Sequence, residues 1–198
     1  MAVIGLTGGI GSGKSALAKW IVEHHFDVTT WNADEVNHAL LEDEDIKQIV
    51  GKFGEEVLSR GGIDRAKLAQ IVFHDSPSKL KELQDIIWPI LSGVLEEEIH
   101  ATKKHIIVDS ALLYELEWDE FCHAVIFVHA PWTERVRRVE SRGWTEQQLI
   151  EREKRQLPLR DKRNKADFIV ENNTTISDAG RQFEIFLEVI TKDKRDED

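Results

Sequence analysis

Cysteine is almost absent from this chain, since Cys122 is the single one among 198 residues. One cysteine cannot build a disulfide framework, and it cannot supply a cysteine-rich metal site. Such a low number is typical of proteins from a reducing compartment. We expect Cys122 to act as a small apolar side chain.

Long apolar runs are absent as well. No uninterrupted apolar segment approaches the ~20 residues that a membrane-spanning helix needs. The first residues also lack the basic segment and following apolar stretch that mark a secretory signal. We therefore expect a soluble, cytoplasmic protein that does not bind membranes.

Positive charge is in deficit, because 26 Lys and Arg residues stand against 37 Asp and Glu, for a net charge of −11. This balance excludes broad binding to nucleic acids or anionic membranes, which are polyanions. A polyanionic ligand must instead be held by a local basic site. The hydrophobic content of 41% supports one substantial core without a second catalytic domain of usual size.

Short apolar runs alternate with amphipathic stretches along the chain. The runs that we predict as strands are Val3–Leu6, Val28–Trp31, Ile106–Val108, Val125–Val128 and Phe168–Val170. Apolar runs separated by helical segments favour parallel strands that are buried on both faces. The pattern predicts an α/β fold with a five-stranded parallel sheet flanked by helices, and ligands at the carboxyl ends of the strands.

The segment between the second and third predicted strands shows no convincing strand of its own. Its apolar residues recur at helical spacing, as in Leu80, Leu83, Ile86 and Ile87. Turn signals occur at residues 59–62 and 75–77, and the expected helix N-caps are Asp64 and Ser76. We interpret residues 36–103 as a helical insertion.

The motif Gly8-Gly9-Ile10-Gly11-Ser12-Gly13-Lys14-Ser15 follows the first predicted strand and has the Walker A spacing. Glycines let backbone N–H groups turn toward a polyphosphate, and the following helix adds positive potential at its N-terminus. Lys14 is expected to reach the outer phosphates, and the Ser15 hydroxyl to bind Mg²⁺. The motif predicts that the chain binds a nucleoside triphosphate.

Two acidic residues lie where predicted strands end. Asp34 follows the second strand, at the edge of the sheet where the phosphate loop lies, and a carboxylate there can accept a proton from a substrate hydroxyl. The alternative for Asp34 is a helix N-cap. Asp109 ends the third strand, which is a usual place for a carboxylate that assists Mg²⁺, and its alternative is a turn residue.

A local basic site is found in the second half of the chain. Its residues are Arg135, Arg137, Arg138, Arg142, Arg152, Lys154, Arg155, Arg160, Lys162 and Arg163. We expect most of them to be solvated surface charges and a few to belong to a lid that covers a phosphoryl group.

The chain closely resembles the dephospho-coenzyme A kinases, a family of P-loop kinases similar to the nucleoside monophosphate kinases. The resemblance runs from about Val3 to about Asn173, and its most specific piece is the extended phosphate loop over residues 4–15. The other matching pieces follow in order: Asn32–Asp34, Phe53–Gly54, Gly62–Arg65, Val72–Phe73, Pro89–Ile90, Asp109–Glu115, Arg155–Pro158, Lys162, Ala166–Asp167 and Glu171–Asn173.

The resemblance implies transfer of the γ-phosphoryl group of ATP to the 3′-hydroxyl of dephospho-coenzyme A, the last step of coenzyme A synthesis. Asp34 would be the base, with Lys14 and Arg138 as the other catalytic residues. Residues Gly8 to Ser15 and Arg142 would bind ATP. Ser15 and Asp109 would hold Mg²⁺, Asp109 through water.

The same resemblance implies that the insertion binds the acceptor, with contacts from Asp34, Arg65, Trp88 and Leu112. It divides the chain into a core (1–35, 104–134 and 165–191), the insertion (36–103), a small helical lid (135–164) and a polar tail (192–198). The expected partners are therefore the small molecules ATP and dephospho-coenzyme A, without nucleic acid and without an obligate protein partner.

The chain departs from the family pattern at three positions. Asn32 stands where the first acid of Asp-Ala-Asp is usual, Trp88 where histidine is usual, and Ala111 where proline is usual. These changes are neutral drift or marks of a different acceptor or weaker activity. Trp31 and Trp88 are, by neighbourhood, candidates for stacking on a ligand.

Two alternatives to this function remain open. One is a related P-loop metabolite or nucleotide kinase with another acceptor. The other is a nucleotide-binding switch or impaired homologue, which would hydrolyse nucleotide slowly and show no acceptor dependence.

Overall fold

The computed structural model describes residues 1–41, 47–59, 62–72 and 77–193. The chain divides into two compact units, which are described separately below. The first comprises Met1–Asn32 and Ala101–Asp198, and the second comprises Ala33–His100.

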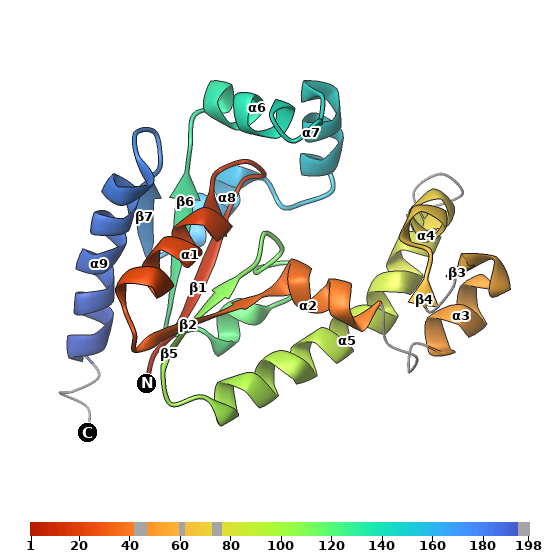
Figure 1. Ribbon diagram of the computed structural model, residues 1–198, viewed down its shortest axis with the longest axis horizontal. Coiled ribbons are helices and arrows are strands. Elements are labelled where there is room, and N and C mark those ends of the chain that lie inside the picture. The colour runs from red at the N-terminus through yellow and green to blue at the C-terminus, as the bar shows by residue number, and fades with distance from the viewer. Residues whose placement is uncertain (42–46, 60–61, 73–76, 194–198) are drawn as a thin grey trace. The chain divides into compact units, whose positions relative to one another are not determined.

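A five-stranded parallel sheet forms the centre of the first unit (Figure 1). Its strands lie in the order β2-β5-β1-β6-β7. Their bounds are Val3–Gly8 for β1, Val28–Asn32 for β2, His105–Asp109 for β5, Ala124–His129 for β6 and Phe168–Glu171 for β7. All five predicted strands and their parallel arrangement are confirmed, and each strand is one or two residues longer than predicted.

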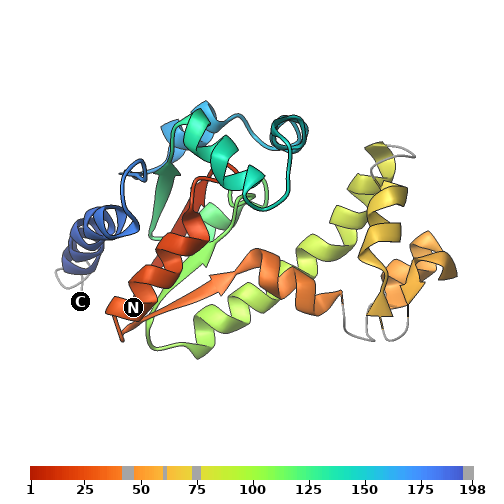
Figure 2. The same cartoon turned by 45° about the horizontal axis from the view of Figure 1, so that its top comes forward.

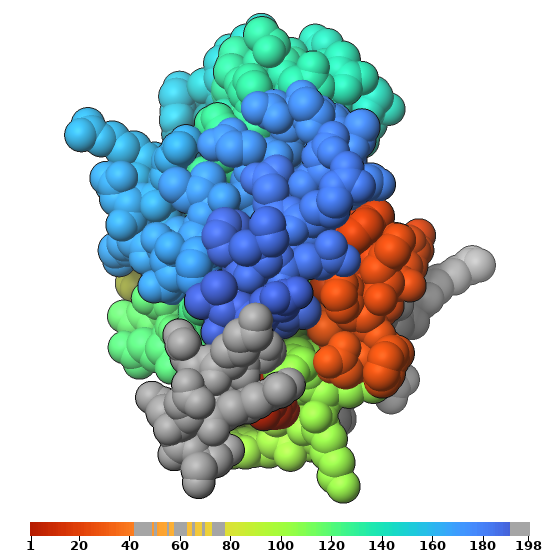
Figure 3. All heavy atoms as spheres, turned by 90° about the vertical axis from the view of Figure 1, so that its left-hand side faces the viewer, coloured from red at the N-terminus to blue at the C-terminus, as the bar shows by residue number. Residues whose placement is uncertain are grey.

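Two helices cover one face of this sheet, namely α1 (Lys14–His24) and α9 (Ile176–Asp193). Figures 1 and 2 show the two helices side by side, and Figure 3 shows their surfaces adjoining in red and blue. Gly180 of α9 allows this approach, since a Cβ there would lie 2.7 Å from Cδ2 of the Trp20 ring on α1. Buried side chains such as Leu17, Ile21 and Phe183 fill the contact with the sheet.

The opposite face is covered by the segment that follows β5. Leu113 and Trp118 of this segment are fully buried. A short 3₁₀ helix, η3 (Trp118–Phe121), leads to Cys122 and then to β6. Gly5 of β1 faces this segment, because a Cβ on it would lie 2.8 Å from Leu113 Cδ2 and 3.0 Å from Cys122 Sγ.

Three short helices connect β6 to β7: α6 (Trp132–Glu140), α7 (Glu146–Glu153) and α8 (Leu159–Lys165). We call residues 132–165 the α6–α8 segment. A capping box begins α7, with Thr145 accepting from the Gln148 backbone N–H and the Gln148 side chain accepting from the Thr145 N–H. The predicted lid, residues 135–164, lies within this segment.

The second unit consists mainly of helices, as expected for the insertion. Its elements are α2 (Ala33–Leu40), α3 (Lys47–Phe53), the 3₁₀ helix η1 (Glu55–Val57), β3 (Leu58–Ser59), β4 (Gly62–Ile63), α4 (Arg65–Gln70) and α5 (Pro77–Ala101). The expectation that it contains no strand is wrong, because β3 and β4 pair antiparallel across the predicted 59–62 turn. Too few residues form this ladder to give an alternating apolar pattern.

Helix boundaries test three further expectations. Asp64 caps α4 as predicted, with its Oδ1 accepting from the N–H groups of Ala66 at 3.0 Å and Lys67 at 3.1 Å. Ser76 lies outside the described residues. The polar tail begins later than predicted, because α9 continues through Lys192 to Asp193, and residues 194–198 lie outside the described part.

No helix within the described ranges is long and apolar enough to cross a membrane.

Candidate active site

The predicted phosphate loop connects the end of β1 to the start of α1. Gly11 and Gly13 have φ angles of 78° and 93°, in the left-handed region that glycine adopts most easily. Gly13 is the N-cap of α1, and no side chain caps the helix there. The first turn of α1 also carries no acidic residue. A helix N-terminus of this kind binds anions through its backbone N–H groups and its dipole.

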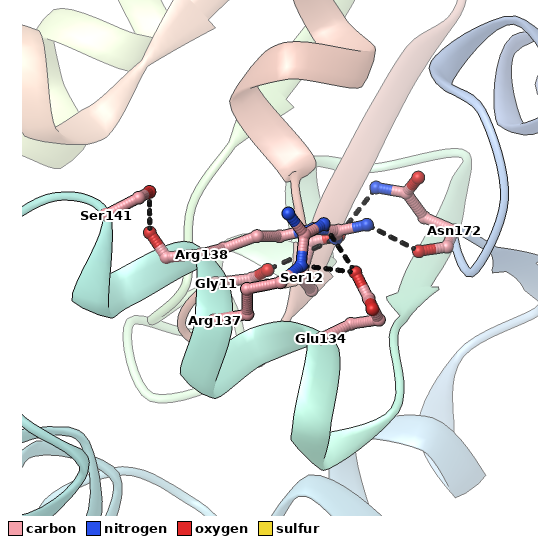
Figure 4. A network of polar contacts seen from close by, with 7 residues as sticks. All are labelled: Gly11, Ser12, Glu134, Arg137, Arg138, Ser141 and Asn172. Carbon is pink, nitrogen blue, oxygen red and sulfur yellow. Dashed lines mark hydrogen bonds and ion pairs between the residues drawn. The ribbon is translucent and has the colours of Figure 1, made fainter.

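Arg138 of α6 holds the carbonyl side of this loop. Its Nη1 donates to Ser12 O at 3.0 Å and to Gly11 O at 3.3 Å, and its Nη2 donates to Asn172 O at 2.9 Å (Figure 4). The Asn172 side-chain amide donates to the same Ser12 O at 2.7 Å. Consecutive carbonyls of the loop are therefore held on one side by Arg138 and Asn172.

Burial lowers the pKa of the Arg138 guanidinium from its usual value. The structure places Arg138, which the resemblance implied to be a catalytic residue, at the phosphate loop, and its action on ATP stays a prediction. Its hydrogen bonds to the loop backbone were not predicted. Arg142 follows the end of α6 and is exposed.

Arg135 and Glu153 hold Ile10, the loop residue that precedes Gly11. The Arg135 guanidinium donates to Ile10 O at 3.3 Å and forms an ion pair with Glu153, whose Oε1 accepts from Ile10 N at 3.2 Å. Arg135 is therefore one of the few members of the basic cluster that are not solvated surface charges, since it is 6% exposed.

Asn32 and Asp109 form a polar pair at the carboxyl ends of β2 and β5. They are register partners in the sheet, and Asn32 Nδ2 donates to Asp109 Oδ2 at 3.0 Å. Asp109 is also aligned with Leu6 of β1, next to the start of the phosphate loop, and it is 4% exposed. Asp109 is the last residue of β5, at the strand end where it was predicted.

This pair gives Asn32, which stands where an acid is usual in the family that the chain resembles, a defined partner. The amide gives Asp109 a hydrogen-bond donor, whereas a carboxylate at that distance would repel it. The Asn32 amide therefore stabilises Asp109, which is the only carboxylate of this pair.

Ser15 and Asp109 are the side chains that were predicted to hold Mg²⁺. A hydroxyl and a carboxylate are the hard oxygen donors that this ion prefers, so the residues present fit it. Within the described residues, no three His, Cys, Asp or Glu side chains gather into a group that would hold a metal by themselves. Such a site takes its other ligands from phosphate oxygens and water.

Asp34 is exposed and lies in the first turn of α2, in the second unit. The alternative that Asp34 is a helix N-cap does not fit, because the helix already begins at Ala33.

The remaining acceptor candidates are distributed over both units. Trp88 is half-buried in α5, and Arg65 begins α4, with a side chain that is outside the described part. Leu112 belongs to the first unit, where its backbone N–H donates to Ser110 Oγ at 3.1 Å.

Trp31 packs in the core instead of stacking on a ligand. It is 5% exposed, and its ring meets Trp118 edge-on at a centroid distance of 5.2 Å. The interpretation of Trp31 as a stacking surface is therefore wrong.

Lys162 is another member of the basic cluster that is buried. It is 0% exposed, and its Nζ lies 2.7 Å from Glu115 Oε1 and 2.5 Å from Ala111 O. The Leu157 N–H donates to the same Glu115 oxygen at 2.8 Å. Because Lys162 lies among charged residues in α8, no local signal indicated its burial, and only the resemblance singled it out.

Residues 2–178 match the family described as dephospho-CoA kinase. A dephospho-CoA kinase from Fusobacterium nucleatum is 35% identical, over 95% of this chain and 98% of its own length. One from Arabidopsis thaliana is also 35% identical, over 94% of this chain and 83% of its own length.

Solved structures share the fold. A protein from Thermus thermophilus is 31% identical and has a TM-score of 0.81, covering 94% of this chain and 96% of its own. A shikimate kinase from Acinetobacter baumannii, at 15% identity and a TM-score of 0.53 over 98% and 95% of the two chains, shares the fold alone. The sequence resemblance is thus confirmed, and the chain belongs to the dephospho-CoA kinase family.

Proposed function

We propose that this protein transfers the γ-phosphoryl group of ATP to the 3′-hydroxyl of dephospho-coenzyme A, which yields coenzyme A. The family supports this reaction. The observation that carries it is the glycine loop at the N-terminus of α1, whose carbonyls are held by arginine and asparagine side chains on one side. Such a loop can direct its N–H groups toward phosphates.

The nucleotide-binding part of the site is the loop from Gly8 to Ser15. Phosphoryl transfer passes through a transition state in which charge spreads over phosphate oxygens, so positioning and charge neutralisation dominate catalysis. Lys14 supplies positive charge to the outer phosphates. Arg138 places a second charge at the loop, and Arg142 is the further candidate from the end of α6.

Asp34 is the proposed general base. A carboxylate in hydrogen-bond reach of the 3′-hydroxyl accepts its proton as the oxygen attacks phosphorus. Arg65, Trp88 and Leu112 are proposed to contact the acceptor. Ser15 and Asp109 would hold Mg²⁺, which supplies charge neutralisation at the phosphates when it is bound.

The first experiment incubates the purified protein with Mg-ATP and dephospho-coenzyme A and follows coenzyme A by mass. Asp34→Asn is expected to lower kcat by about a hundredfold or more, the usual contribution of a general base. Glu35→Gln is the matched control, since it removes the neighbouring charge from the same exposed turn of α2. Product formation that survives Asp34→Asn would refute Asp34 as the base.

A screen of other acceptors addresses the alternative kinase. Absence of coenzyme A with intact ATP binding would refute the proposed acceptor and would make Asn32, Trp88 and Ala111 evidence for a different one. Slow ATP hydrolysis that no acceptor accelerates would favour the nucleotide-dependent switch.

A further inference from the structure

Both backbone polar groups of Ile10 are held by one ion pair from outside the phosphate loop. The C=O accepts from Arg135 of α6, and the N–H donates to Glu153 at the end of α7. Arg135 and Glu153 are also paired with each other, and their side chains are only 7% and 16% exposed. Ile10, Arg135 and Glu153 thus each contact the other two.

The surroundings of Arg135 leave it little freedom. Its guanidinium carbon lies 5.0 Å from the centroid of the Trp132 ring, a cation–π distance. The backbone of α6 also packs on the loop, since a Cβ on Gly11 would lie 2.8 Å from Arg135 O. The ion pair is therefore held in one position beside the phosphate loop.

Because Arg135 is positive and Glu153 is negative, we expect the two side chains to affect nucleotide binding differently. Glu153 puts a carboxylate beside a loop that binds a polyanion, and an unpaired carboxylate there would repel phosphate. Arg135 neutralises that carboxylate, so the pair shapes the loop without adding negative potential. Loss of Arg135 must then weaken nucleotide binding more than loss of the Glu153 charge.

We propose that Arg135 and Glu153 act together as positioning residues that fix the Ile10 peptide and so preorganise the phosphate loop for ATP. The inference rests on the proposed function only in that ATP is the nucleotide. Neither side chain is required to touch the reacting atoms, because the effect passes through the backbone of Ile10.

The test is direct binding of Mg-ATP, measured by calorimetry without any acceptor, together with KM for ATP and kcat. Arg135→Gln is expected to raise Kd and KM for ATP by about tenfold or more, the equivalent of one hydrogen bond to a charged group. The change in kcat should be smaller than the change in KM. Arg137→Gln is the matched control, because Arg137 pairs with Glu134 on the exposed side of the same helix.

The two variants of Glu153 separate positioning from general stability. Glu153→Gln retains an oxygen that can accept from Ile10 N–H, whereas Glu153→Ala leaves that N–H without the bond. Glu153 lines an open cavity of about 360 Å³ beside Trp132 and Leu157, so neither change creates a clash. We expect near-normal Kd for the Gln variant and a Kd raised about threefold to tenfold for the Ala variant.

The double variant Arg135→Gln/Glu153→Gln tests whether the unpaired Glu153 carboxylate weakens ATP binding. It should bind ATP more tightly than Arg135→Gln alone, because it removes the carboxylate that Arg135 had neutralised. The proposal is overturned if folded Arg135→Gln and Arg137→Gln bind ATP equally, or if the double variant is no better than Arg135→Gln. If Arg135→Gln does not fold, the difference in Kd between Glu153→Gln and Glu153→Ala decides, and equal Kd values for these two variants overturn the proposal.

Failure of this inference differs from failure of the proposed function. A wild-type protein that binds Mg-ATP and makes no coenzyme A refutes the acceptor, while the order of Kd values among the variants still tests the ion pair.

Discussion

The α6–α8 segment is joined to the rest of the first unit by two buried ion pairs that differ in what they hold. At one end, Arg135 and Glu153 both come from the segment and hold the backbone of Ile10. At the other end, Lys162 of α8 pairs with Glu115, which belongs to the segment after β5. The first pair shapes a loop, and the second pair joins two distant parts of the chain.

The two ion pairs also differ in their burial and in the hydrogen bonds of their carboxylates. Lys162 is completely buried, and Glu115 Oε2 is buried without a hydrogen-bond partner among the described residues. Glu153 is partly accessible beside its cavity. Both contacts are ion pairs, but their loss is expected to have different effects. Loss of the Arg135–Glu153 pair should weaken nucleotide binding through Ile10, and loss of the Lys162–Glu115 pair should lower the free energy of unfolding.

The largest expected effect is on stability, for Lys162→Met. It leaves the Glu115 carboxylate buried without its counter-charge, which costs about 3–5 kcal/mol of the free energy of unfolding. Urea unfolding measures this loss. Arg160→Met, at an exposed position of the same helix, should change the free energy of unfolding by less than about 0.5 kcal/mol. Similar losses for both variants would contradict the assignment of a structural role to Lys162.

The second largest effect is expected for Gly13→Ala, which changes the phosphate loop itself. Gly13 has φ 93°, and a Cβ there would collide with the Asn172 amide that holds Ser12 O. We expect Kd for Mg-ATP to rise by about tenfold or more through loss of that bond and of the cap geometry.

Gly143→Ala is the matched control for this change, since Gly143 has φ 82° with no atom within 4 Å of an added Cβ. It should carry the cost of backbone strain, about 1 kcal/mol of stability, with unchanged ATP binding. If both alanines weaken ATP binding alike, the contact with Asn172 is not the cause.

The smallest effect concerns Cys122, which lies in the segment between β5 and β6, as Glu115 does. Burial, with smaller contributions from Asp119 and Asp167, raises the pKa of its thiol to about 12, and its Sγ donates to Trp118 O. Reaction with a thiol reagent at pH 8 should be slow in the folded protein and fast in urea. Lys162→Met should accelerate the reaction and Arg135→Gln should not.

The same thiol gives a pH dependence. Because the pKa of Cys122 is raised in the folded state, its contribution to stability is complete below the usual pKa of 9.0 and is lost as pH rises toward about 12. Cys122→Ser should make unfolding less sensitive to pH in that range, measured by urea titrations at several pH values. An unchanged alkaline dependence would refute this contribution.

Much of the site was predictable from local sequence. The glycine spacing of residues 8–15 predicted the phosphate loop, and strand ends predicted that Asp109 lies beside it. Arg138 also lies at the loop, but only the resemblance, and no local pattern, singled it out. The contacts of the α6–α8 segment were not predictable, because the Arg135–Ile10 contact spans 125 residues and the Lys162–Ala111 contact spans 51.

The sequence by itself determined the five parallel strands, the phosphate loop and the Asp64 cap. Each depends on residues that are close in the chain, where apolar runs and glycine spacing act directly on the backbone. Only the tertiary structure decided which charges are buried. Arg135 and Lys162 resemble their solvated neighbours in sequence, and a charge is buried only where distant segments bring it a partner and exclude water.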